Sequence, residues 1–113
     1  MKVRLSQKAA DYVRQEASYL RQHSRSAADR FLERVKSVRL DLEDFAQAGF
    51  SDRELELPVP NLRRFIRDGY RYDYRIGKTH IEIAVISSSV NTPLQAPDDE
   101  GDFEVAPSSD PER

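Results

Sequence analysis

The chain has 113 residues, with 18 Lys and Arg against 20 Asp and Glu, and no cysteine. This length predicts a single domain, and the lack of cysteine excludes disulfides, thiolate metal sites and cysteine catalysis. No apolar run approaches the roughly 18 residues of a membrane helix, and the N-terminus lacks the apolar stretch of a signal peptide. We therefore expect a cytoplasmic protein with no membrane partner.

The net charge of −2 is the sum of two unlike segments. Residues 1–94 carry a net charge of +4, whereas residues 95–113 carry seven acids and one arginine, a net charge of −6. Such an acidic segment, with few hydrophobic residues, buries too little apolar area to offset its ordering entropy. We expect a folded domain over residues 1–92 and an acidic, proline-rich tail over residues 93–113 that is disordered alone.

The N-terminal half predicts a strand followed by a helical hairpin. Residues 2–5 alternate polar and apolar side chains, as a short strand would. Ser6 is a suitable N-cap for a first helix. A second helix is expected to begin at a capping box over residues 26–29 and to end with Gly49 at C′. Apolar residues three and four apart predict the buried faces: Ala9, Val13, Ala17 and Leu20 in the first helix, and Ala28, Phe31, Val35, Val38, Leu42 and Phe45 in the second.

Residues 62–87 predict three strands joined by two tight turns, and the rest of the chain is organised around them. Asp68-Gly69 is a strong signal for a type I′ hairpin turn, which needs positive φ at both central residues. Gly77-Lys78 fits a type II′ turn with glycine at the first central position. An apolar run at residues 83–86 suits a central strand covered on both faces. The expected fold class is α+β, a three-stranded antiparallel meander after a strand and a helical hairpin (β-α-α-β-β-β).

The predicted meander is dense in tyrosine and arginine. Tyr70, Tyr72 and Tyr74 alternate with Arg71 and Arg75, so the tyrosines and the arginines lie on opposite faces of one strand. Tyrosines at this spacing are first interpreted as packing residues. The arginines are either a solvated face, paired with nearby acids, or a binding surface. The basic residues of this region are Arg63, Arg64, Arg67, Arg71, Arg75 and Lys78.

Several segments carry a family pattern: Leu62-Arg63-Arg64, Gly69-Tyr70-Arg71, Tyr74-Arg75-Ile76, the apolar strand 81–86 and the helix segment 27–35. In this pattern and in element order, residues 2–92 resemble the ParE/RelE toxin superfamily of bacterial type II toxin–antitoxin systems. The resemblance implies the RelE/ParE-like fold and a cognate antitoxin as partner.

The superfamily has two main activities. RelE-like members cleave mRNA on the ribosome, which needs a general base, a general acid and cations on the phosphate. That branch typically carries lysines in the loop before the second strand and a Tyr or His after the last strand. Here residues 51–61 hold Arg53 but no lysine, and residues 87–91 hold no His or Tyr. The absences favour the ParE-like branch, which poisons DNA gyrase, although ParE-like chains often have His where Ser87 or Ser88 lies.

The resemblance therefore implies a toxin that inhibits DNA gyrase and is neutralised by its antitoxin. The alternatives are a RelE-like ribosome-dependent mRNA endonuclease and a small interaction domain without toxicity. We expect no cofactor, no sequence-specific nucleic acid binding and no metal site, since His80 has no second His or Cys nearby. A RelE-like activity would use Arg63, Arg71, Arg75 and Tyr74. The residues expected to bind target or antitoxin are Arg63, Arg64, Arg67, Arg71, Tyr72 and Arg75.

Overall fold

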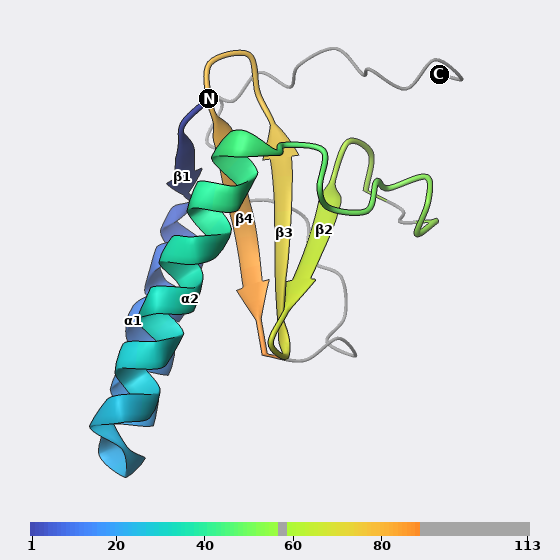
Figure 1. Ribbon diagram of the computed structural model, residues 1–113. Helices are drawn as coiled ribbons and strands as arrows, with labels where there is room; N and C mark the ends of the chain where they lie inside the picture. Colours follow the sequence, from blue (N-terminus) through green and yellow to red (C-terminus); the bar gives the residue numbers. More distant parts are fainter. Residues whose placement is uncertain (57–58, 89–113) are drawn as a thin grey trace.

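The computed structural model describes residues 1–56 and 59–88, which form one sheet and two helices (Figure 1). The strands lie in the order β1-β4-β3-β2, with β1 parallel to β4 and the other neighbours antiparallel. This arrangement confirms the expected α+β fold and its element order. The tail expected over residues 93–113 lies outside the described residues. The elements are β1 (Val3–Leu5), α1 (Gln7–His23), α2 (Arg25–Asp44), β2 (Arg63–Arg67), β3 (Tyr70–Ile76) and β4 (Ile81–Ser87).

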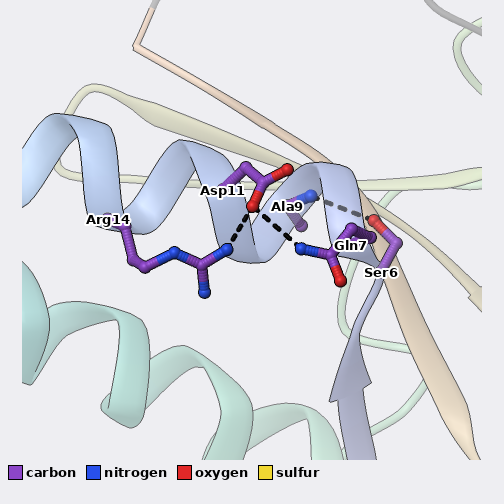
Figure 2. Close-up of polar contacts among 5 residues, drawn as sticks. All are labelled: Ser6, Gln7, Ala9, Asp11 and Arg14. Atoms are coloured by element: carbon purple, nitrogen blue, oxygen red, sulfur yellow. Dashed lines mark hydrogen bonds and ion pairs between the residues drawn. The ribbon is translucent and has the colours of Figure 1, made fainter.

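Helix α1 begins at the predicted cap. The Ser6 hydroxyl accepts a hydrogen bond from the backbone N–H of Ala9 at 3.0 Å, which satisfies one of the free N–H groups of the first turn. Figure 2 shows the next turn, where the Asp11 carboxylate accepts hydrogen bonds from the side chains of Gln7 and Arg14. No helix in the described part of the chain has the length and apolar character of a membrane span.

Helix α2 begins and ends earlier than the sequence predicts. Its N-cap is Ser24, whose hydroxyl accepts from the N–H of Ala27 at 3.2 Å, so the capping box expected two residues later is wrong. The helix ends at Asp44, and Phe45 adopts a non-helical backbone conformation. Phe45 is consequently 68% exposed instead of joining the buried face. Gly49 lies beyond the helix and has a packing role described below.

The core lies between the two helices and one face of the sheet (Figure 1). Tyr72 and Tyr74 of β3 face the helices together with Ile81, Ile83 and Ile86 of β4. The predicted apolar faces supply the helical side of this core and are confirmed, apart from Phe45. The fully or nearly fully buried helix residues in it are Ala9, Ala17, Phe31, Val35, Val38 and Leu42.

A β-bulge in β4 decides which side chains reach the core. Ile83 and Val85 pair with adjacent residues of β3, so that Ala84 between them is unmatched on that strand. The Ser6 hydroxyl donates a hydrogen bond to the Ala84 carbonyl at 2.8 Å. The extra residue moves the strand alternation by one position. As a result Ile86, as well as Ile83, faces the helices.

One of the two predicted turns is confirmed. Asp68 and Gly69 have φ values of 53° and 83°, as a type I′ turn requires. The expected Gly77-Lys78 turn is wrong, because the Gly77 N–H bonds the His80 carbonyl at 2.9 Å and so places the turn between those two residues. Gly77 is accordingly not among the residues with positive φ.

Side chains of α2 cover the outer edge of β1. Glu43 accepts a hydrogen bond from the Val3 N–H at 3.4 Å, and Arg39 donates to the Val3 carbonyl at 3.3 Å. An edge strand otherwise presents such groups to other chains. The first strand is therefore closed on both sides, by β4 and by α2.

Candidate functional site

The predicted binding residues divide between the two faces of the sheet. Arg63 and Arg67 lie on the helix-covered face, where they pair with Tyr74 and Tyr70 across β2 and β3; Tyr72 shares this face. We call the opposite face, turned away from α1 and α2, the open face (Figure 1). By strand alternation and register it is formed by Arg64, Ile66, Arg71, Asp73, Arg75, Glu82, Val85 and Ser87.

Asp73 is the centre of a charged network on the open face. The Nε–H of Arg64 donates to Asp73 Oδ1 at 2.9 Å, and Arg71 Nε lies 3.4 Å from Asp73 Oδ2. The Arg71 and Asp73 side chains are 1% and 0% exposed. On the neighbouring strand pair, Arg75 donates to Glu82 at 2.9 Å. The Asp73 network and the separate Arg75–Glu82 pair together hold three guanidinium groups on one face.

The Arg71 guanidinium is charged despite its burial. Burial lowers its pKa, the Asp73 carboxylate opposes this change, and the nearby Arg64 adds to it. Arginine keeps its charge in proteins, and the Asp73 carboxylate beside Arg71 stabilises the protonated form. Among the described residues, Arg64 and Arg71 both contact the Asp73 carboxylate, so two positive charges lie beside one negative charge at the centre of the open face.

Apolar residues neighbour this network along the strands and across them. Leu62, Ala84 and Val85 are 1%, 1% and 3% exposed, yet they are not part of the core between sheet and helices. Phe50 forms a bridge to β2 opposite Arg64, and both Phe50 and Ile66 are about half exposed, at 52% and 47%. Arginine beside aromatic and aliphatic side chains is typical of protein–protein interfaces.

Arg63 and Tyr74 hold the segment that follows α2. Arg63 Nη2 donates to the carbonyls of Gln47 and Gly49 at 2.9 and 2.6 Å. The Tyr74 hydroxyl donates to the Ala46 carbonyl at 2.7 Å and accepts from the Gly49 N–H at 2.9 Å. A Cβ at Gly49 would lie 2.7 Å from Tyr74 Cε1, so glycine is required there. Both residues thus stabilise the fold at this point.

Arg67 and Tyr72 also pack within the domain. Arg67 donates to Asp41 at 2.6 Å and to Ser37 at 3.2 Å, and its guanidinium lies 4.8 Å from the centre of the Phe65 ring. Tyr72 is 0% exposed, and its hydroxyl has no hydrogen-bond partner within residues 1–56 and 59–88. These two side chains lie on the helix side, apart from the open face.

The contact between Tyr70 of β3 and Glu16 of α1 was not predicted from the sequence. The Tyr70 hydroxyl donates to Glu16 of α1 at 2.5 Å, and burial followed by this bond and the Glu16 charge raises the pKa of Tyr70 well above its usual value. Burial, assisted by Asp68, raises the pKa of Tyr72 to about 12. The sequence offered one signal for this contact, the position of Glu16 beside the apolar stripe of α1. The partner of Glu16 was not predictable, because it comes from a strand that is distant in the sequence.

Residues 3–90 match the family model described as "ParE toxin of type II toxin-antitoxin system, parDE". The chain belongs to this family. It is therefore a toxin of a type II toxin–antitoxin system, and the family implies an antitoxin partner. The expected membership of the ParE/RelE superfamily is confirmed. No curated protein matches the chain at a significant level.

In this ParE-family toxin, the structure brings together three of the residues singled out from the sequence. Arg64, Arg71 and Arg75 share the open face, with Asp73 and Glu82 as their counter-ions. The remaining predicted residues lie on the helix-covered face. The sequence indicated only that acids lie near these arginines, and the structure shows that Asp73 and Glu82 are the acids they contact.

Proposed function

We propose that this toxin inhibits DNA gyrase and that its cognate antitoxin neutralises it by direct binding. The observation that carries the proposal, together with family membership, is the position of the Tyr74 hydroxyl. A RelE-like reaction needs a general acid or base beside the cations that hold the phosphate. Tyr74 was the expected candidate, but it is 0% exposed and bonded to the backbone at Ala46 and Gly49. This supports a toxin that acts by binding a protein.

The ion pairs of the arginines also support a toxin that acts by binding a protein. Cations that hold a reacting phosphate must be accessible to it. The Arg64 and Arg75 side chains are 14% and 12% exposed and bonded to carboxylates, and Arg71 is buried against Asp73. A protein partner with acidic and apolar side chains could instead contact the edges of these groups.

We place the binding surface on the open face and its rim. Phe50 and Ile66 flank Arg64 there, and exposed apolar groups beside an ordered arginine have the composition of an interaction hot spot. An antitoxin segment that carries acidic and apolar residues would complement this surface. Gyrase acts on cytoplasmic DNA, so the proposal also places the toxin in the cytoplasm.

Expression of the toxin without antitoxin tests the proposal. Gyrase inhibition predicts filamentous cells with DNA breaks and induction of the DNA-damage response while translation continues. Rapid loss of translation would contradict it and favour the ribosome-dependent endonuclease. Normal growth with soluble, folded protein would favour the non-toxic interaction domain.

A matched pair of arginine variants tests the location. Arg75→Ala removes an open-face guanidinium whose partner Glu82 retains contact with solvent, and it should abolish toxicity while the protein stays folded. Arg21→Ala removes an exposed arginine from the last turn of α1 and should leave toxicity unchanged. Equal toxicity of the two variants would show that the surface lies elsewhere.

A further inference from the structure

The open face has the properties of a covered surface although neither helix lies on it (Figure 1). Val85 and the Arg71–Asp73 pair on this face are at most 3% exposed. Buried charges on a sheet face require partners or a covering segment. Within the described residues, α1 and α2 account only for burial on the opposite face.

The C-terminal residues come directly after β4, a strand that contributes to the open face. β4 ends at Ser87, which pairs with Arg71 in the sheet, and residues 89–113 lie outside the described part of the chain. The four strands, about 4.8 Å apart, span about 15 Å, whereas ten extended residues reach about 33 Å. The remaining chain is therefore long enough to reach any point on the open face.

The chemistry of residues 95–113 complements that of the open face. This segment carries seven acids and one arginine, opposite a face where Arg64 and Arg71 share one carboxylate. It also contains Phe103 and Val105 within its acidic run, which suits a face that combines arginines with apolar side chains.

We propose that residues 95–113 dock on the open face of their own domain and compete with the antitoxin for it. The competition rests on the proposed function, whereas the docking itself does not. Tethering places the tail at an effective concentration near the millimolar range. If its intrinsic dissociation constant is about 0.1–1 mM, antitoxin binding is weakened about two-fold to ten-fold. Docking that involves these charges weakens as salt screens them.

Amide chemical shifts of the full-length toxin test the docking directly. The test variant has five neutralised acids, and the control variant has Ser108→Ala with Ser109→Ala in the same segment. Neutralisation should shift the amide signals of β2, β3 and β4 near Arg64, Arg71 and Val85, and high salt should move the wild-type signals the same way. The control should leave them unchanged. The neutralising substitutions are Asp98→Asn, Asp99→Asn, Glu100→Gln, Asp102→Asn and Glu104→Gln.

The outcomes separate docking from the proposed function. Shifts confined to the tail itself would overturn the docking. Shifts that grow with protein concentration would also overturn it, because the occupant would then be the tail of another copy. The cognate antitoxin should bind the neutralised variant about two-fold to ten-fold more tightly than wild type, most clearly at low salt. Docking with equal antitoxin affinities would overturn the competition and leave the toxin assignment untouched.

Discussion

Tyr72 and Tyr74 occupy equivalent buried positions on the same face of β3, but only the Tyr74 hydroxyl has hydrogen-bond partners within the described residues. Both side chains are 0% exposed. The two tyrosines therefore differ in what their hydroxyl groups contribute, although their spacing in the sequence makes them look alike.

Replacement of each tyrosine by phenylalanine should give opposite results. Tyr74→Phe leaves the Gly49 N–H and the Ala46 carbonyl without a partner, which should lower the free energy of unfolding by about 1–3 kcal/mol. Tyr72→Phe removes a buried hydroxyl that has no partner among residues 1–56 and 59–88, and it should be neutral or stabilising. Urea unfolding of the two variants measures both changes. A larger loss for Tyr72→Phe would contradict the hydrogen-bond assignment.

The raised pKa of Tyr72 predicts a loss of stability in alkali. Its pKa is about 12 in the folded chain against 10.0 ordinarily, so the unfolded chain loses this proton first as pH rises. The stabilisation is complete below pH 10 and disappears as pH approaches 12. Between about pH 9 and pH 11 the wild type should lose about 1 kcal/mol more than Tyr72→Phe. Parallel stability curves for the two proteins would show that Tyr72 titrates normally.

Removal of the Asp73 charge should be strongly destabilising. Asp73→Asn leaves the buried Arg71 and its neighbour Arg64 without their carboxylate, which should cost about 3–5 kcal/mol. The matched control is Glu82→Gln, which breaks the Arg75 pair where both side chains retain some contact with solvent. Its cost should be clearly smaller. Equal losses in thermal unfolding would argue against a special role for the Asp73 network.

A charge placed in the apolar face of α2 tests whether this face is part of the core. Leu42 is 0% exposed, so Leu42→Asp buries an unpaired carboxylate and should prevent folding. Lys36→Ala on the exposed side of α2 should cost little. Arg39 is unsuitable as the control, because it donates to the Val3 carbonyl. Circular dichroism melting compares the variants, and similar melting temperatures would mean that the assigned face is wrong.

Features of the fold that depend on neighbouring residues in the chain were predicted from the sequence. Positive φ at Asp68 and Gly69 follows from the turn type, and the buried helix faces follow from apolar spacing. The bulge at Ala84 was not predictable, because the carbonyl of that residue is bonded by Ser6 from a segment distant in the chain. The early end of α2 was missed for a similar reason, since the segment beyond it is held by Tyr74.

The site was predicted in composition but not in arrangement. The sequence indicated an arginine- and tyrosine-rich sheet, and alternation along one strand separated Arg71 from Tyr72. Only the strand register shows that Arg64 joins Arg71 at Asp73, while Arg63 turns to the helix side and binds backbone carbonyls. Pairings between strands depend on register, which composition and spacing within one strand do not define.

The most direct test of the central claim compares the purified toxin on its two candidate targets. In a DNA supercoiling assay, the toxin should inhibit gyrase, and addition of the cognate antitoxin should restore supercoiling. In a ribosome-dependent assay, the same preparation should leave mRNA intact. Uninhibited supercoiling together with ribosome-dependent mRNA cleavage would contradict the account.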